Sequence, residues 1–244
     1  PIRRAQLIAP FGAGAMVVVR DGTSLVCGGL DRWYEREGGS DPSKPVDIEE
    51  YQVEEWRLQR QLKVSHFRLP PDYRDSAPQG EKPNNYKLTV PFLRFPQWHF
   101  CPSRNCKRLY ELPLSMREKK KCNACEVSGK TRYVLQVPFV AICDRGHLQD
   151  FPWREWVHKT ANPNCSLPMR LVSTGGASLA AQIVKCDCGK DRSLTSVTTS
   201  GNDGSFLSRN LDESGALYLC GGKRPWLGDE ASEPCGQHLR GSLR

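Results

Sequence analysis

The sequence predicts an α+β protein that is irregular in architecture and rich in loops. Only 38% of its 244 residues are hydrophobic, and 21 glycines and 18 prolines leave little room for long regular elements. Its 11 cysteines lie mostly in closely spaced pairs, with histidines between them. An odd number of cysteines in such an arrangement suits metal binding in a reducing compartment better than disulfide bonding. We therefore expect a zinc ribbon and one or two further zinc-stabilised modules.

Composition along the chain indicates three segments. We expect an N-terminal α+β segment at 1–84, a four-cysteine zinc ribbon arm at 85–138 and a further zinc domain at 139–244. The first boundary lies in a proline-rich stretch, which we expect to be extended and to be mobile around 76–84.

The N-terminal segment should begin with a hairpin. Gly12 and Gly14 precede the β-branched run Val17–Val19, and Asp21-Gly22 supplies a second turn. The glycine loop lacks the lysine and the hydroxyl of a phosphate-binding loop and precedes a strand, so its glycines are read as turn residues.

One helix is predicted in this segment, from about Asp47 to Leu62. Asp47 and Glu50 have the spacing of a capping box, in which each side chain bonds the other residue's backbone N–H. Part of an apolar face comes from Trp56, Leu58 and Leu62.

The strongest pattern is a pair of cysteine knuckles. Cys101 and Cys106 have four residues between them, Cys122 and Cys125 have two, and fifteen residues separate the pairs. This spacing brings four thiolates to one tetrahedral zinc, and it leaves no open position for catalysis. A ribbon this small has little core of its own, and a structural zinc contributes about 10 kcal/mol or more in such modules.

A second candidate site follows the ribbon. Cys143, His147, His158 and Cys165 have three, ten and six residues between them, and a short helix begins near Asp150, which can cap it. Two nitrogens and two sulfurs could close a tetrahedral site. In the plainer alternative the histidines form local hydrogen bonds and the cysteines are inert.

A catalytic site is a second alternative for the same residues. Cys143 would be the nucleophile and His147 the base, oriented by Asp144 or Asp150. Nothing in the sequence indicates a strained nucleophile turn or an oxyanion hole, so we prefer the hypothesis that these residues bind a metal.

A third candidate site lies in the last third of the chain. Cys186 and Cys188 form a tight knuckle before a glycine, and Cys220 and Cys235 are separated by fourteen residues. We group these four as one zinc set; the alternative is that they are reduced cysteines of the core. Cys27 is unassigned, and His238 is a possible substitute ligand.

The ribbon is strongly basic. Nine Lys or Arg residues and three Glu residues lie between Cys101 and Tyr133, an excess of six positive charges (nine minus three). DNA phosphates would be contacted by Arg104, Lys107, Arg108, Arg117, Lys119, Lys120 and Lys121. Trp98 or Tyr110 could stack on bases. Two alternatives stay open: the lysine run is a solvated loop, or the chain only docks a protein. The docking anchors would be Trp153, Trp156 and Trp226, and buried packing is an equal alternative for each of them.

Membrane and secretory signals are missing from this sequence. No apolar run reaches the roughly 18 residues of a membrane span, and no cleavage site follows the basic start, so we expect a cytoplasmic protein. The chain stops at Arg244 with no helix stop or strand end, as a fragment would.

Several motifs, taken in order, resemble those of one known family. They are FGAGAMV, GGLDRWY, HFRLPP, CPSRNC, CNAC, CDRGHLQDFPWREWVH, STGGASL, CDCG and LCGGKRPWLG. They are similar to the DrmB family of the DISARM anti-phage defence system. That family carries a zinc-containing domain of unknown function also found at the C-terminal ends of certain superfamily-two DNA helicases. The resemblance is strongest from His99 to Leu227.

The resemblance implies a non-catalytic subunit that pairs with a helicase-like ATPase, DrmA, and helps it engage DNA, as single strands or a tailed duplex. A methyltransferase would mark self DNA in the same system. The resemblance makes residues 139–244 a helicase-associated zinc domain, which in the family continues past Arg244. It also supports the ribbon's four cysteines as one zinc set, and Cys186, Cys188, Cys220 and Cys235 as another. The family supplies no catalytic residues.

Overall fold

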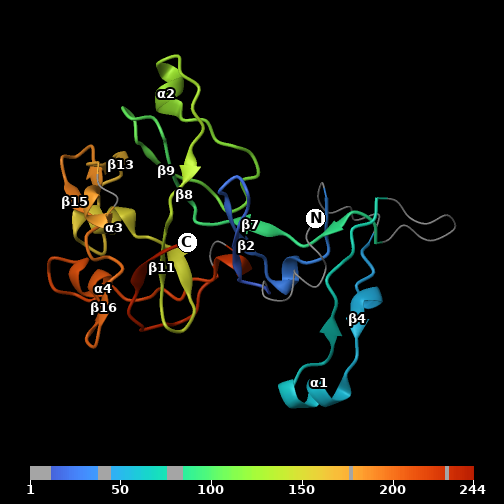
Figure 1. Ribbon diagram of the computed structural model, residues 1–244. Coiled ribbons are helices and arrows are strands. Elements are labelled where there is room, and N and C mark those ends of the chain that lie inside the picture. Colours follow the sequence, from blue (N-terminus) through green and yellow to red (C-terminus); the bar gives the residue numbers. More distant parts are fainter. Residues whose placement is uncertain (1–11, 38–44, 76–84, 176–177, 229–230) are drawn as a thin grey trace. The chain divides into compact units, whose positions relative to one another are not determined.

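The computed structural model describes residues 12–37, 45–75, 85–175, 178–228 and 231–244 (Figure 1). Short helices and short strands are joined by long loops, which confirms the predicted α+β, loop-rich class. Within these described ranges, no helix is long and apolar enough to cross a bilayer.

The chain forms two compact units. One comprises Pro1–Val17 and Val26–Leu93, and the other comprises Val18–Leu25 and Arg94–Arg244. The predicted boundary at 76–84 lies outside the described residues, and the division into three segments stays a prediction.

The predicted N-terminal hairpin is present. Strands β1 (Met16–Val18) and β2 (Ser24–Cys27) are neighbours in a sheet of order β1-β2-β7, where β7 is Phe92–Arg94. In the connecting turn, the Gly22 N–H donates to the Val19 carbonyl at 2.9 Å. Gly22 has φ of +80°, which glycine adopts without steric cost, so this glycine serves the turn.

The first unit has short strand pairs and a small aromatic core. Both pairs are antiparallel: β3 (Glu35–Arg36) with β6 (Leu88–Thr89), and β4 (Gln52–Val53) with β5 (Phe67–Arg68). Its helical elements are η2 (Leu30–Arg32), η3 (Glu49–Tyr51) and α1 (Trp56–Leu62). The buried residues that form its core are Trp33, Tyr34, Tyr51 and Leu88.

The predicted helix is shorter than expected. It begins at Trp56, capped by the Glu55 side chain, which accepts from the Arg57 N–H. The capping box at Asp47 is wrong because the Asp47 N–H donates to Asn85 Oδ1, while Glu50 pairs with Arg74. The predicted apolar face is not buried either: the exposed fractions are 67% for Trp56, 47% for Leu58 and 58% for Leu62.

The second unit contains the ribbon. Strand β8 (Trp98–Phe100) pairs on one side with β9 (Leu109–Glu111) and on the other with β10 (Leu135–Gln136), all antiparallel. The short helix α2 (Asn123–Val127) lies in the connection between β9 and β10 (Figure 1).

A second sheet of this unit has β11 (Phe139–Ile142) at its centre, between β12 (Leu148–Asp150) and β18 (Arg240–Leu243). The last residues of the sequence, Arg240–Leu243, therefore form a paired strand. Asp150 ends β12 and does not cap the next helix, because its carboxylate accepts from the backbone of the Trp98 region.

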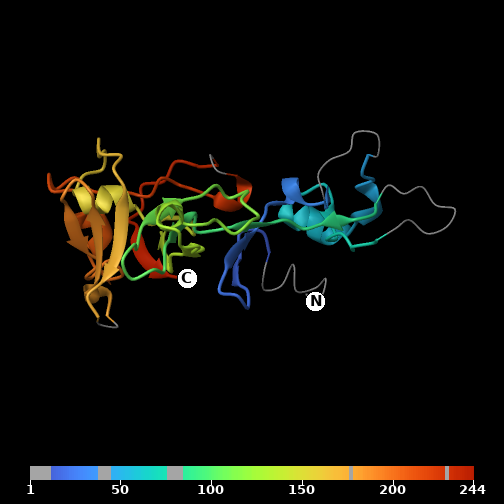
Figure 2. The ribbon, with the colours of Figure 1, turned by 90° about the horizontal axis from the view of Figure 1, so that it is seen from above.

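A third sheet has the order β13-β14-β15, with β13 at Met169–Ser173, β14 at Gln182–Cys186 and β15 at Asp191–Ser193. Helix α3 (Trp153–His158) lies against β14 and β15 (Figure 2). The remaining elements are η4 (Leu179–Ala181), β16 (Ser200–Gly201), β17 (Gly204–Ser205), α4 (Phe206–Asn210) and η5 (Pro225–Leu227).

The main core joins the second and third sheets through α3. Trp153 and Trp156 are each 1% exposed and pack against Phe151, with ring centroids 4.8 and 6.0 Å away. These two tryptophans are therefore core residues, and the prediction that they anchor a partner is wrong. Trp226 is half-buried.

Candidate metal centres and a basic groove

The ribbon cysteines come together as predicted. The sulfur atoms of Cys101, Cys106, Cys122 and Cys125 all lie within 4.8 Å of one another. Cys101 follows β8, Cys122 is the residue before α2, and Cys125 lies in its first turn. The tight knuckle geometry is set by backbone bonds, in which the Cys106 N–H donates to Ser103 and the Cys125 N–H to Cys122, each at 3.1 Å.

In the ribbon cluster, the Cys122 thiol ionises more readily than a free cysteine, because its pKa is lowered. Burial acts to raise the pKa of Cys122, but hydrogen bonds led by that from the Tyr110 hydroxyl, 3.1 Å from the sulfur, bring it down to about 7. Burial raises the pKa of Cys101 to about 12. A metal ion would supply the positive charge that lets all four thiols ionise together.

The other predicted ligands also gather, but in different sets. One cluster contains Cys143, His147, Cys220 and Cys235. The other contains His158, Cys165, Cys186 and Cys188. All twelve predicted metal ligands thus lie in three clusters, but the predicted grouping of the last eight is wrong. Cys143 and His147 join Cys220 and Cys235, and His158 and Cys165 join Cys186 and Cys188.

Strand pairing explains the exchange. Because β18 pairs with β11 and Leu219 bridges His238, the segment that carries Cys220 and Cys235 reaches the turn between β11 and β12. That turn holds Cys143 and His147. In the third sheet, Met169 of β13 is opposite Cys186 of β14, which brings the preceding Cys165 beside that strand. Spacing along the chain contains none of this information.

In the second cluster, His147 is buried and both of its ring nitrogens have a partner. His147 is 2% exposed, its Nδ1 lies 3.3 Å from the Cys143 sulfur, and its Nε2 lies 2.6 Å from Glu233 Oε1. A metal-ligating histidine commonly donates its second ring N–H to a carboxylate in this way. If His147 were a catalytic base for Cys143, Glu233 would orient it, and not Asp144 or Asp150. The further sulfurs of Cys220 and Cys235 in the same cluster favour a metal site instead.

The third cluster is assembled at the end of α3. His158 Nδ1 lies 2.7 Å from the Arg154 carbonyl, so its Nε2 faces Cys188, 3.4 Å from the sulfur. The Cys165 and Cys186 sulfurs are 3.6 Å apart. Cys27 and His238 belong to none of the three clusters found among the described residues.

The donor sets fit zinc. One cluster offers four thiols, and each of the others offers three thiols and one imidazole. Four ligands of these types form the closed tetrahedral shell of structural zinc sites.

The predicted basic residues do not all line one groove. Lys119 and Lys120 line a groove of about 450 Å³, whereas Arg108 lies beside Asp187, 4.0 Å away. Lys107 donates to the Pro102 carbonyl and lies 5.9 Å from the Phe100 ring centroid. The remaining three predicted contacts are solvent-exposed: Arg104, Arg117 and Lys121.

Two arginines that the sequence did not single out complete the groove. Arg94 donates to the carbonyls of Arg117 and Glu118, and Arg244 donates to those of Val137 and Gly22. These carbonyls hold the guanidinium groups in place without neutralising them.

The rest of the groove is suited to an anionic, stacking ligand. Asp21, 4.0 Å from Lys119, is the one carboxylate among the lining residues, which all lie in the described part of the chain. Burial lowers the pKa of His99 to about 4, so this lining residue is neutral at pH 7. Tyr133 also lines the groove and is 46% exposed.

Comparison with known proteins is consistent with the motif resemblance. The model of a family described as "Domain of unknown function (DUF8724)" matches residues 3–244. Over 157 residues, the chain is 31% identical to a protein of Bacillus paralicheniformis (strain ATCC 9945a / NCIMB 11709 / CD-2) named "DISARM protein DrmB". That alignment covers 62% of this chain and 25% of the relative. The resemblance predicted from the motifs is confirmed, over about a quarter of the relative's length.

Proposed function

The chain belongs to the family of the domain of unknown function DUF8724, and we propose that it is a non-catalytic, zinc-binding part of an anti-phage defence complex that binds DNA. The relative named DISARM protein DrmB supports the defence role. The observation that carries DNA binding is the groove lined by Arg94, Lys119, Lys120 and Arg244. We place the protein in the cytoplasm, where phage DNA is met.

Zinc would be structural in all three centres. Each cluster offers four ligand side chains, which fills the tetrahedral shell and leaves no position for a water to be activated. The ions would hold the turns that join β8 to β9, β11 to β12 and β14 to β15, where the chain buries few apolar side chains.

Phosphates would lie along the four cations of the groove, and an unpaired base would stack on Tyr133. This replaces the predicted stacking on Trp98, which is 7% exposed, or on Tyr110, whose hydroxyl lies 3.1 Å from the Cys122 sulfur and which does not line the groove. We propose no base-specific contact, since the amide of Gln136 in the groove is engaged with Ser24 and Pro96. This suits a subunit that helps a helicase-like ATPase, the DrmA component, to engage any invading DNA.

Protein docking is the second candidate. It is favoured by α1 in the first unit, which leaves Trp56, Leu58 and Leu62 exposed. A scaffold of this kind would dock the ATPase through α1 and make no contact with DNA.

Fluorescence anisotropy separates the two candidates. Labelled single-stranded and tailed duplex DNA would be titrated with the whole chain between about 50 and 200 mM salt, with and without the ATPase. Direct contact predicts that Lys119→Glu with Lys120→Glu weakens binding and reduces the log–log salt slope by about 0.7 per lysine for single strands.

The matched control reverses two exposed lysines outside the groove, Lys63→Glu with Lys190→Glu, and should leave the slope unchanged. Equal effects of the two double variants would reject the groove. Binding that requires the ATPase and is lost in Trp56→Ala would establish the docking scaffold instead.

A further inference from the structure

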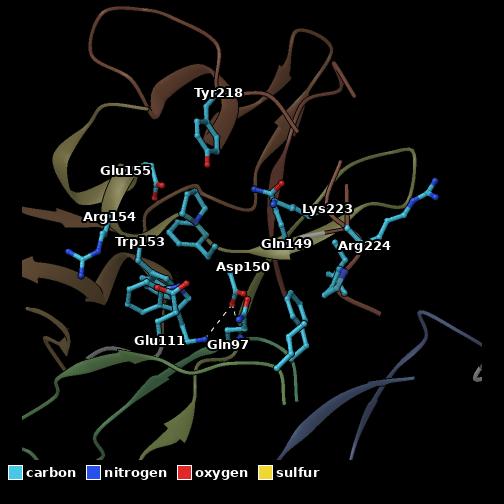
Figure 3. Close-up of a pocket in the computed structure, with 18 residues that line it drawn as sticks. Gln97, Glu111, Gln149, Asp150, Trp153, Arg154, Glu155, Tyr218, Lys223 and Arg224 are labelled. Atoms are coloured by element: carbon cyan, nitrogen blue, oxygen red, sulfur yellow. Dashed lines mark hydrogen bonds between the residues drawn. The ribbon is translucent and has the colours of Figure 1, made fainter. Parts of the chain in front are cut away.

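A second cavity of about 450 Å³ opens on a different part of the second unit, between β12, α3 and the loop before η5 (Figure 3). Three carboxylates line it, and each comes from a different element: Glu111 from β9, Asp150 from β12 and Glu155 from α3. Its walls include Phe95, Trp98, Phe151, Trp153 and Tyr218.

None of the three carboxylates forms a salt bridge among the described residues, although the charges of Arg154 and His158 act on Glu155. Asp150 Oδ1 accepts from the backbone N–H groups of Gln97 and Trp98, at 2.9 and 3.4 Å, while neither Glu111 nor Glu155 forms an ion pair there. Burial raises the pKa of Asp150 to about 7 and also raises that of Glu155, and the charge of Glu111 adds to both shifts. Asp150 and Glu155 therefore keep their protons to higher pH than exposed carboxyls do, and a cation bound among the three groups would favour their charged forms.

The cations that line the cavity are mostly engaged elsewhere. Arg154 donates Nη1 to the carbonyls of Cys165 and Leu167 and points away from the cavity in Figure 3. Arg224 pairs with Glu233 at 2.6 Å. Of the three lining cations, only Arg224 is thus paired with a carboxylate in the described residues; the carbonyls hold Arg154 without neutralising it, and Lys223 remains beside the three carboxylates.

A second observation points to a ligand in the same cavity. Trp153 is 1% exposed, and its Nε1 donor is buried with no hydrogen-bond partner in the described part of the chain. A buried donor without an acceptor is costly, so a bound group that brings an acceptor would be stabilised here. In Figure 3 the Tyr218 hydroxyl also points toward this space.

The spacing of the three carboxylates favours a guanidinium over a metal ion as the bound cation. Glu111, Asp150 and Glu155 are not among the groups of metal-type side chains whose ligand atoms lie within 4.8 Å of one another in the described residues, so they are too dispersed to share a metal ion. A guanidinium is planar and carries five N–H donors, which can reach several carboxylates while its face lies on an aromatic ring. The fold uses the same stacking internally, where the Arg192 guanidinium lies 3.5 Å from the Trp156 ring centroid.

We propose that this cavity binds an arginine side chain of a partner polypeptide. Glu111, Asp150 and Glu155 accept from its guanidinium, and Trp153 Nε1 donates to a carbonyl of the same segment. The site lies apart from the basic groove, since the two cavities share no lining residue.

The test follows the indole N–H signals of the six tryptophans by ¹H–¹⁵N NMR on the whole chain, with Trp153→Phe used to assign one of them. The probe is N-acetyl-arginine N-methylamide, and N-acetyl-citrulline N-methylamide is its neutral counterpart. The arginine probe should shift the Trp153 signal in a saturable way, and the citrulline probe should bind about tenfold more weakly or worse, since a charged hydrogen bond commonly contributes that much.

Variants locate the contact. Glu111→Gln and Glu155→Gln should each weaken arginine binding about tenfold, whereas Glu126→Gln, an exposed carboxylate on α2, should not. Glu155 accepts a hydrogen bond from its own backbone N–H, which the amide oxygen of glutamine can also accept, and neither tested glutamate forms a salt bridge in the described fold. Equal binding of the two probes, no saturable shift of the Trp153 signal, unchanged affinity in both glutamine variants, or a Trp153 shift caused by oligothymidine in place of arginine would overturn the proposal.

Discussion

The Nε2 atom of His147 lies 2.6 Å from Oε1 of Glu233, a residue 86 positions further along the chain. The opposite ring nitrogen faces the Cys143 sulfur at 3.3 Å. The carboxylate therefore fixes both the tautomer and the orientation of the imidazole, as it does around a metal ligand. Glu233 itself is held by Arg145 and Arg224.

Replacing that carboxylate should weaken one zinc site. In Glu233→Gln we expect zinc affinity at the Cys143 cluster to fall about 10- to 100-fold, measured by competition with a chelating dye. Arg224→Gln is the matched control, because it removes an ion pair of Glu233 and leaves the contact with His147 in place. Equal losses in the two variants would show that the carboxylate acts through local folding alone.

The exchange of ligand sets can be counted directly. Cys186→Ser with Cys220→Ser should cost two zinc ions by native mass spectrometry, because the structure places these cysteines in different clusters. Cys143→Ser with Cys220→Ser should cost one. The grouping predicted from spacing reverses these two results, so the pair of variants decides between them.

Asp150 should make the fold less stable as the pH rises. The pKa of this carboxyl is raised from 3.8 to about 7, mainly by burial, so the folded chain holds a proton that the unfolded chain releases between these values. Stability from this group is present below about pH 4 and is lost by about pH 7. In Asp150→Asn, the fall in unfolding free energy between pH 5 and pH 8 should be smaller; an unchanged profile would contradict the shift.

Two tryptophans should behave in opposite ways. Trp156 is 1% exposed and contacts Phe151, Phe206 and Arg192, so Trp156→Ala should destabilise the chain by about 3–5 kcal/mol. Trp56 is 67% exposed, so Trp56→Ala should change the stability by about 0.5 kcal/mol or less. Chemical denaturation measures both, and a large loss in Trp56→Ala would mean that α1 is packed in solution.

Residue type and local spacing were enough to identify the metal-type ligands but not to group them. The ribbon set is local, since Cys101 to Cys125 span one hairpin and its connection, and its prediction agrees with the structure. The remaining sets depend on β18 pairing with β11 and on β13 pairing with β14, which are tertiary relationships. Cysteine counts contain no information about such pairings.

The predictions of the helix start and of the groove residues were wrong for related reasons. Asp47 and Glu50 match a capping box locally, but Asn85 and Arg74, distant in sequence, take up their hydrogen bonds. Arg94 and Arg244 lie outside the basic run, and the fold places them beside Lys119 and Lys120. A charge count along the chain finds the lysines and misses the arginines.

The central claim is that three zinc centres hold this chain together, and the zinc count of the intact protein tests it most directly. Native mass spectrometry of the purified, reduced chain should show three zinc ions, all lost with a strong chelator together with the cooperative unfolding transition. Fewer than three bound ions, or a chelated chain that unfolds as cooperatively as before, would contradict the account.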